Sequence, residues 1–285
     1  MASMRDIKRR RDSIQSTQQI TKAMKLVSTV KLQRARVRAE NSKPYFDKMY
    51  ETVQSILEKS GNIDHPYLKA NGSAKKAVIV VTSNRGLAGG YNNNIVKMIM
   101  DSGMNKEDVD IYGIGKKGVE TLVRRGYHIV DDSSDIINEP LFSDAAGIGR
   151  KVLNAYTAGE VGEIYLAYTE FKNTVVHNPK LIKLLPVEVE ASDEPQESKE
   201  APMNFEPDAE ESLDMIIPNY INSTIYGAFI EAVASENGAR MQAMDAATSN
   251  ADEMISALSL AYNRARQGAI TQELTEIISG AEALN

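Results

Sequence analysis

The sequence predicts an α/β protein in which a long antiparallel coiled coil, formed by the N- and C-terminal helices, carries a Rossmann-like α/β domain with a mostly parallel sheet inserted between them. Apolar residues recur at helical spacing over most of both ends of the chain, and short apolar runs alternate with amphipathic stretches in its middle. We expect a coiled-coil helix over residues 1–60, the α/β domain over 75–190, an acidic loop over 191–208 and a second coiled-coil helix over 209–285.

The first segment is predicted to be helical because it contains no Gly and a single Pro from about Ser3 to Lys59. Its apolar residues at roughly helical spacing are Ile7, Ile14, Ile20, Met24, Val27, Val30 and Val37. We expect nearly sixty residues of helix, roughly 80 Å at about 1.5 Å per residue. Pro44 should kink or interrupt the helix, and Ser60-Gly61 should end it.

The middle of the chain alternates between predicted strands and helices. The strands are "KKAVIVVTSN", "VDIYGIG", "YHIV" and "GEIYLAYTEF", and the helices between them are "YNNNIVKMIMDSG", "KKGVETLVRRG" and "SDAAGIGRKVLNAYTAG". This order favours a parallel sheet. "TVVHNPKLIKLLPVEV" should add a closing strand, and "TEFKNTVVHN" an antiparallel hairpin at the edge. Residues 188–208 hold three prolines among many acids and read as a loop.

The helical pattern returns at about Asp208 and continues to Asn285, with an early interruption at Pro218. The apolar positions that step by three and four are Met244, Ala247, Ala251, Met254, Leu258, Ala261 and Ala265. The frame slips at residues 266–268 and resumes from Ile270 to Leu284. Each terminal helix is too long to bury its apolar stripe on a small domain, so we expect the two helices to pack on each other up to the C-terminal tip.

The amino-acid composition excludes several classes of functional site. With 42% apolar and 25% charged residues, the 285-residue chain resembles an ordinary soluble protein. The absence of Cys excludes disulfides, thiolate metal sites and a cysteine nucleophile, and the three histidines are far apart in the sequence. We predict no catalytic constellation, no metal site and no cofactor. No apolar run reaches the length of a membrane-spanning helix, and the Arg-rich start lacks the apolar stretch of a secretory signal.

Charge is distributed unevenly along the chain. Residues 1–40 hold eleven Lys and Arg against three acids, whereas residues 188–214 hold eleven acids against one Lys. A basic helix can bind nucleic acid or anionic lipid, can be a solvated face, or can bind a protein partner that presents acids.

Two glycine-rich stretches are candidate sites. "GIGKKG" places Gly113, Gly115 and Gly118 in a GxGxxG pattern, and Asp131-Asp132 follow the next strand. An NAD-dependent enzyme is therefore a rival hypothesis, although the pattern follows the second strand of the unit rather than the first. "TSNRGLAGGYNNN" is either a tight turn or an exposed loop that contacts a partner through Asn84 and Arg85. A third hypothesis is a coiled-coil adaptor that binds acidic surfaces or nucleic acid.

Three longer stretches resemble one known family. "ITQELTEIISGAEA" is similar to the C-terminal signature of the gamma subunits of F-type ATP synthases, "ITKAMKLVSTVKL" to their N-terminal helix, and "TSNRGLAGGYN" to a loop of their central domain. "RARQGAITQE" and "ENGARMQAMDAAT" match as well, and the resemblance covers essentially the whole chain.

The resemblance implies a rotating central stalk of a proton-translocating ATP synthase, with the coupling ion, H⁺ or Na⁺, left open. Its implied partners are the alpha and beta subunits of the catalytic hexamer, the epsilon subunit and the c-ring, and its implied place is the cytoplasmic side of the cell membrane, as a peripheral protein without an active site. The beta-subunit contacts that the family implies are Arg266, Gln267, Thr271, Met24, Lys25, Leu87 and Ala88.

The sequence departs from the family pattern at several places, one of which is the acidic loop over 188–208, more charged than is usual in the family. Lys25 stands where many relatives carry Glu, and Gly268 stands where Ala is common. The cysteine-bearing insert of the chloroplast members is absent, which excludes thiol control of that kind.

Overall fold

We describe the chain from a computed structural model, which describes residues 3–59, 65–69, 71–187 and 209–282. The acidic loop expected over 191–208 and the predicted seam residue Leu284 lie outside these ranges. Contacts within the chain divide it into two units: residues 1–29 with 240–285, and residues 30–239. Helices α1 (Met4–Lys59) and α5 (Ala209–Glu282) are each continuous and contribute to both units. The four segments assigned from the sequence stay a prediction.

The unit of residues 30–239 is built on a five-stranded sheet in the order β3-β2-β1-β4-β5. Its strands are β1 (Lys76–Val81), β2 (Val109–Ile114), β3 (His128–Asp132), β4 (Glu163–Phe171) and β5 (His177–Leu185). The first four are parallel, and β5 pairs antiparallel with β4 at the edge. The expected edge hairpin and the mostly parallel sheet are therefore confirmed.

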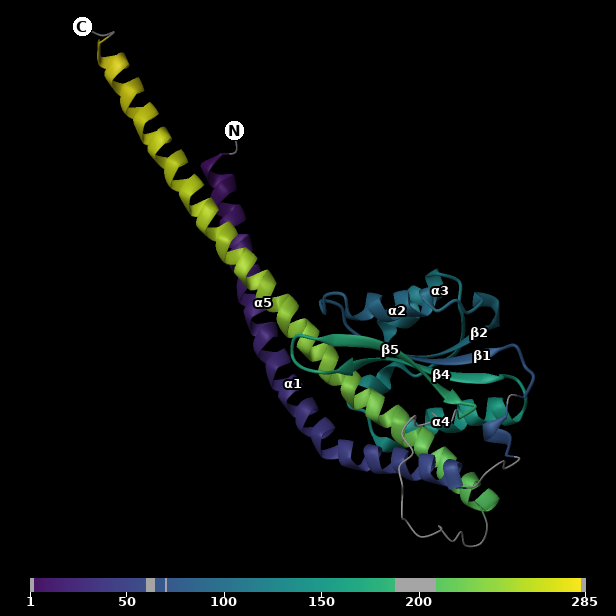
Figure 1. Ribbon diagram of the computed structural model, residues 1–285. Helices are drawn as coiled ribbons and strands as arrows, with labels where there is room; N and C mark the ends of the chain where they lie inside the picture. The colour runs from purple at the N-terminus through teal and green to yellow at the C-terminus, as the bar shows by residue number, and fades with distance from the viewer. Residues whose placement is uncertain (1–2, 60–64, 70, 188–208, 283–285) are drawn as a thin grey trace. The chain divides into compact units, whose positions relative to one another are not determined.

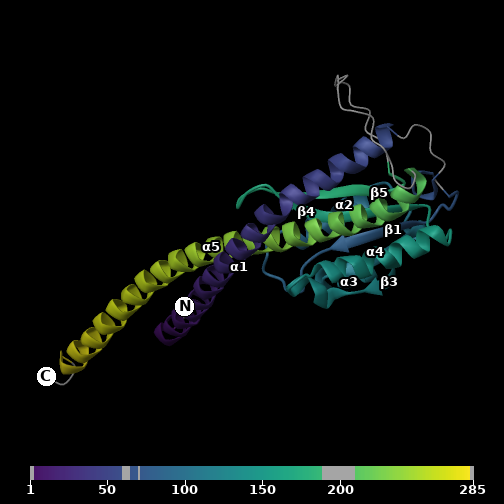
Figure 2. The ribbon, with the colours of Figure 1, turned by 90° about the horizontal axis from the view of Figure 1, so that it is seen from below.

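Helices cover both faces of this sheet (Figure 1). Helices α2 (Tyr91–Asp101) and α3 (Lys116–Arg124) pack on one face, where Val78, Val80 and Ile111 bury their side chains. Helix α4 (Phe142–Thr157) and the first part of α5 cover the other face, as Figure 2 shows from below. The short 3-10 helices Pro66–Leu68, Lys106–Asp108 and Ser134–Asn138 complete the connections. The central strands β1 and β2 are buried and largely apolar on both faces, as strands between two helical layers are expected to be.

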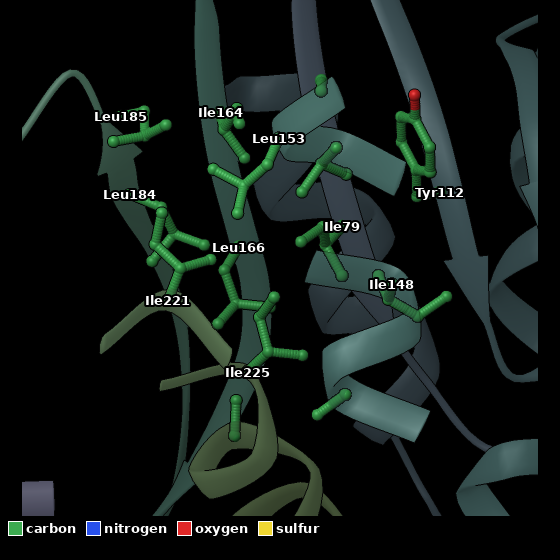
Figure 3. Packing of buried hydrophobic residues seen from close by; sticks show 14 of the residues in the cluster. Ile79, Tyr112, Ile148, Leu153, Ile164, Leu166, Leu184, Leu185, Ile221 and Ile225 are labelled. Atoms are coloured by element: carbon green, nitrogen blue, oxygen red, sulfur yellow. The ribbon is translucent and has the colours of Figure 1, made fainter. Parts of the chain in front are cut away.

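The larger core joins the sheet to α4, α5 and the end of α1. Ile148 and Leu153 of α4 meet Ile79 and Ile164 of the sheet, and from α5 Ile221 lies beside Leu184 and Ile225 beside Leu166 (Figure 3). Phe229 is fully buried in the same cluster, and Val53 and Ile56 bring α1 into it. The inner ends of both long helices therefore belong to the core of this unit.

The two prolines do not interrupt their helices. Pro44 lies inside α1, which curves in its second half but continues to Lys59 (Figure 1). Pro218 lies inside α5, so the interruption predicted there is wrong. Neighbouring packing explains this difference, because Leu213, Ile217 and Ile221 around Pro218 are fully buried and hold the helix on the sheet domain.

The unit of residues 1–29 and 240–285 is an antiparallel helix pair. Thr21 of α1 lies opposite Thr248 of α5, Lys25 lies opposite Asp245, and Gln18 lies opposite Asp252. Rising numbers on one helix meet falling numbers on the other, which confirms the expected antiparallel coiled coil.

The faces predicted for this coil are partly wrong. Ile20, Val27, Val30 and Val37 are 45–58% exposed rather than packed against α5, and Met254 is 44% exposed. The expectation that α1 accompanies α5 to its tip is also wrong. Residues 266–281 of α5 are exposed on every side, and Figure 1 shows α5 continuing past the first turn of α1.

Candidate partner-binding surfaces

The inner seam of the helix pair follows one heptad pattern along α1. The residues of α1 that are shielded from solvent at steps of four and three are Ile7, Arg11, Ile14, Gln18, Thr21, Lys25 and Ser28. The same steps continue to Leu32, Ala35, Val53 and Ile56, which are buried in the other unit. If the heptad pattern is extended from these apolar positions towards the N-terminus, it identifies the seam of α1 from the sequence. The most hydrophobic positions of α1 instead identify its outer face.

Polar contacts join the two helices along this seam. The Oγ1 atoms of Thr21 and Thr248 are 2.8 Å apart, the Nζ of Lys25 is 2.5 Å from the Oδ1 of Asp245, and the amide of Gln18 donates to the carboxylate of Asp252. Farther along, the guanidinium of Arg11 lies over the ring of Tyr262, 5.7 Å from its centroid. The side of α1 that faces α5 is therefore unusually polar for a coiled coil.

The outside of the pair carries the apolar surface instead. Ile20, Leu26 and Val27 on α1 are between 58% and 63% exposed. Together with Val30, they form a stripe that no part of the described chain covers. Exposed apolar stripes of this kind mark interaction surfaces.

Three of the predicted site residues lie at the α5 tip. Arg266, Gln267 and Thr271 are exposed, and the hydroxyl of Thr271 donates to the backbone carbonyl of Gln267, 2.9 Å away. The apolar side chains of Ile270, Leu274, Ile277 and Ile278 are 49–68% exposed beside them. The tip of α5 therefore begins with exposed polar side chains at Arg266 and Gln267 and continues towards the C-terminus as a largely apolar helix.

Met24 and Lys25 lie elsewhere on the same helix pair. Lys25 faces Asp245, which precedes Arg266 on α5 by 21 residues, about 30 Å of helix. Met24 is half-buried beside Lys25. The structure therefore gives Lys25 a carboxylate partner within its own chain.

Leu87 and Ala88 belong to the loop that connects β1 to α2, in the other unit. Leu87 is 62% exposed and has a φ of 62°, whereas Ala88 is buried. The loop is held by Ser83, whose backbone N–H donates to the Oδ1 of Asn92 (2.9 Å) and whose hydroxyl donates to the carbonyl of Arg85 (2.7 Å). A left-handed, outward-pointing Leu on a well-bonded turn is a surface suited to contact.

Asn84, in contrast, has a structural role in the loop. Its amide donates to the carbonyl of Ser134 (2.8 Å), and its Oδ1 accepts the backbone N–H of Lys116 (3.0 Å). Arg85 is exposed and remains the contact residue expected there.

The GxGxxG turn is filled by the protein itself. The hydroxyl of Thr82 accepts the backbone N–H of Gly118 at 3.0 Å, and the carbonyl of Ser83 accepts that of Lys117 at 3.0 Å. A Cβ on Gly115, whose φ is 101°, would lie 2.1 Å from the carbonyl oxygen of Thr82. These glycines let α3 approach β1 closely, and the amides that a pyrophosphate would use are already bonded.

The acids after β3 also have partners inside the protein. Asp131 accepts from Lys151 (2.5 Å), and Asp132 caps the backbone N–H of Ser134 (3.1 Å). Within the described ranges, no cluster of three or more His, Asp or Glu side chains could hold a metal ion. None of the helices in those ranges has the length and apolarity needed to cross a membrane.

These surfaces define a class of protein: a subunit that presents long helical faces to partner chains. A family model described as ATP synthase matches residues 3–284. The ATP synthase gamma chain of Lachnoclostridium phytofermentans is 66% identical over 291 residues, covering 100% of both chains. That of Alkaliphilus metalliredigens is 47% identical, covering 99% of this chain and 98% of the relative. A sodium ion specific gamma chain of Acetobacterium woodii is 42% identical and covers 99% of each.

A solved structure of the Euglena gracilis mitochondrial ATP synthase contains a chain of the same fold. Its TM-score is 0.69 at 18% identity, over 99% of this chain and 94% of that one. The chain therefore belongs to the gamma chain family, the central-stalk subunits of F-type ATP synthases. As a member it is a subunit of an ATP synthase complex, and a peripheral part of that membrane-bound assembly.

Proposed function

We propose that this chain is the non-catalytic rotor of its ATP synthase. It turns inside the ring of alpha and beta subunits at its helical end, and its sheet domain binds the epsilon subunit and the c-ring on the cytoplasmic side of the membrane. The observation that carries the proposal is the α5 tip, residues 266–281, which is exposed all around and has no helix partner within the described chain. The titles of two fold relatives, "central stalk/cring" and "rotor", support the same arrangement.

The tip is suited to a rotating contact by its composition. Its exposed apolar side chains can pack against an apolar inner surface of the ring without fixed ion pairs, so rotation of the chain breaks no strong directional bond. These side chains are Ile270, Leu274, Ile277 and Ile278. Arg266, Gln267 and Thr271 lie at its lower end, where hydrogen bonds to a beta subunit can form and release. Met24 and Leu87 are further proposed contacts.

Asymmetry supplies the mechanism. A single chain within a threefold ring presents a different face to each of three catalytic sites, and different faces favour different conformations of those sites. One third of a turn passes each site to its next state. Linkage requires the reverse as well, so that ATP hydrolysis in the ring drives the rotor.

The filled GxGxxG turn supports a role without a dinucleotide or an active site on this chain. Thr82 and Ser83 occupy the amides at the start of α3 that a nucleotide phosphate would need. We expect no micromolar NAD binding when the isolated chain is titrated with the dinucleotide.

The coupling ion is proposed to be H⁺, with Na⁺ as the alternative that the name of the Acetobacterium woodii relative raises. ATP-driven pumping by the purified complex in vesicles, measured with and without Na⁺, distinguishes the two. The rotor mechanism is the same for either ion.

The test of the rotor proposal is the double variant Arg266→Ala/Gln267→Ala in the complete complex. We expect the ratio of ions pumped to ATP hydrolysed to fall about tenfold, the loss of ~1.4 kcal/mol of contact at an interface centre. The matched control is Arg124→Ala/Asn138→Ala, which removes the same kinds of group from exposed positions of the sheet domain. Wild-type pumping by the tip variant would refute the contact role.

A further inference from the structure

We propose that three polar contacts fix the register of the two helices against each other. These contacts, which we call the rung contacts, are Gln18–Asp252, Thr21–Thr248 and Lys25–Asp245. Lys25 is then a positioning residue of the rotor rather than a partner contact. All three lie within the unit of residues 1–29 and 240–285. The functional part of this inference rests on the proposed rotor role, whereas the register itself does not.

The three contacts occupy consecutive layers of the coil, with the shielded side chains on α1. Gln18, Thr21 and Lys25 step by three and four on α1, and Asp245, Thr248 and Asp252 step by three and four on α5. Thr248 lies at a shielded seam position of α5, whereas Asp245 and Asp252 are exposed and flank the seam beside the buried Met244 and Ala251, so the two outer contacts cross the edge of the coil. Polar residues at seam positions lower stability but select one register, because other registers leave them facing unsuitable neighbours.

The apolar contribution to register is weak in this unit. Five of the seven seam positions of α1 between Ile7 and Ser28 are polar. The shielded positions of α5 that face them include Thr248 and Ala251, which have short side chains, as well as the larger Met244 and Ile255. Knobs-into-holes packing of large apolar side chains, the usual determinant of register, is therefore limited on the α1 side of the seam, where only Ile7 and Ile14 contribute.

Slipping by one heptad would change each facing pair. Thr21 would then lie opposite Ile255 in one direction and opposite Met241 in the other, so its hydroxyl would lose the partner hydroxyl of Thr248. Thr21 is only 9% exposed, which limits replacement of that contact by water, and its hydroxyl would keep only the carbonyl of Gln18, 3.0 Å away in its own helix. The slip would shift one helix by about 10 Å along the other.

Register matters to the rotor because the two helices offer different surfaces. The apolar stripe of α1 with Ile20 and Val27 and the α5 band with Arg266 and Gln267 keep a fixed axial offset only while the helices stay in register. In a slipped pair, one of the two surfaces would be displaced along the helix axis relative to the subunits that bind it.

The ion pair of Lys25 is the rung contact most open to exchange. Its side chain is 39% exposed and that of Asp245 is 57% exposed, so the pair adds little stability by itself. Its orientation is nevertheless specific, because reversing both charges preserves the attraction and reversing one destroys it.

The test uses the full-length chain, which has no native cysteine. By the register of the rung contacts, Ile14→Cys/Ile255→Cys reports the native layer, and Ile14→Cys/Thr248→Cys and Ile14→Cys/Tyr262→Cys report the two slipped ones. Oxidative cross-linking in otherwise wild-type chain is expected to favour the native pair at least tenfold. Equal cross-linking of native and slipped pairs would overturn the register.

The rung contacts are then removed by Gln18→Ala/Thr21→Val/Lys25→Ala. We expect the native preference to fall by about fivefold or more in this background. The matched control, Lys22→Ala/Glu253→Ala, removes charges from exposed positions beside the seam and should leave the preference unchanged. An unchanged preference in the rung variant would refute the lock, whatever role the chain has in the complex.

The charge swap Lys25→Asp/Asp245→Lys distinguishes positioning from a direct partner contact. In the complete complex, Lys25→Asp alone should lower the ratio of ions pumped to ATP hydrolysed, and the swap should restore it together with native cross-linking. Restored cross-linking without restored pumping would show that Lys25 touches a partner, and would refute its assignment as a positioning residue.

Discussion

The carboxylate of Glu163 joins three strands of the sheet, and its substitution by Gln is expected to give a pH-dependent loss of stability. Its Oε2 lies 2.8 Å from the Nζ of Lys76 on β1, and its Oε1 lies 3.0 Å from the Nζ of Lys183 on β5. Tyr165 also donates its hydroxyl to Glu163 at 3.1 Å. These contacts of Glu163 therefore connect the antiparallel edge strand β5 to the parallel part of the sheet.

Burial by itself would raise the pKa of Glu163, but the hydrogen bonds and charges of Lys76 and Lys183 outweigh it and lower the pKa from 4.5 to about 2. A difference of this size corresponds to about 3.4 kcal/mol at neutral pH if fully expressed. The side chain is 26% exposed and its partners are flexible lysines, so we expect about half, roughly 1.5–2 kcal/mol.

The sign follows from the lowered pKa. Because the folded state holds the carboxylate ionised more strongly than the unfolded state, the stabilisation is complete well above pH 4.5 and is lost as the pH falls towards 2. At pH 3 about two fifths of it remains by the same relation. Glu163→Gln keeps the shape and an acceptor oxygen but removes the charge, so its cost should shrink from pH 7 to pH 3.

Urea unfolding of the full chain at pH 7, 5 and 3, with and without the substitution, measures this difference. Glu120→Gln is the matched control, because Glu120 pairs with a single lysine, Lys117, on the exposed face of α3. It should change stability far less than Glu163→Gln at every pH. A cost of Glu163→Gln that is the same at pH 7 and pH 3 would refute the reasoning.

Three further predictions address packing, backbone and charge. Phe229→Ala, at a fully buried position, should cost about 3–5 kcal/mol in urea unfolding, and a cost below about 1 kcal/mol would contradict the assigned core. Gly115→Ala should cost at least about 1–3 kcal/mol in the same assay, because its φ is 101° and its Cβ would lie 2.1 Å from Thr82 O, whereas Gly147→Ala, with open space around its Cβ, should not destabilise. Binding of the chain to the alpha–beta ring should weaken as salt rises, since Lys8, Arg9 and Arg10 are exposed, and salt-independent binding would remove the electrostatic part of the proposal.

The order of strands and helices was predictable because each element has its own hydrophobic periodicity and is bounded by turn residues. β1 and β2 are apolar on both sides, as expected of buried parallel strands, and glycines mark the turns at Gly103, Gly115 and Gly126. The closing strand was recognised from its length and its hairpin, although it begins at His177 rather than Thr174. Local patterns were sufficient here because the sheet buries its strands within the chain itself.

The facing of the long helices was not predictable from hydrophobicity, because part of their apolar surface is not buried by this chain. Ile20 and Val27 gave a helical rhythm, but the structure turns them outward and buries Thr21 between the helices, with Lys25 partly shielded beside it. The contact residues at the tip could be assigned only by resemblance, since Arg266 and Gln267 are exposed and pack against no other helix of the described chain. The partners that we propose for them belong to other subunits, which a single sequence does not contain.

This exchange of polar and apolar faces has a physical consequence for a rotor. Burying a large apolar seam between α1 and α5 would stabilise the isolated pair but leave a polar outside with little affinity for an apolar sleeve. The observed pair does the opposite: Ile20, Leu26 and Val27 stay available to partners, while Thr21 and Lys25 hold the helices in register. The surrounding subunits then contribute part of the stability of the helix pair, so removing the ring should loosen residues 1–29 and 240–282 before the sheet domain. Hydrogen exchange measured on the free chain and on the complex tests this, and equal protection of the helix pair in both would show that the seam is sufficient by itself.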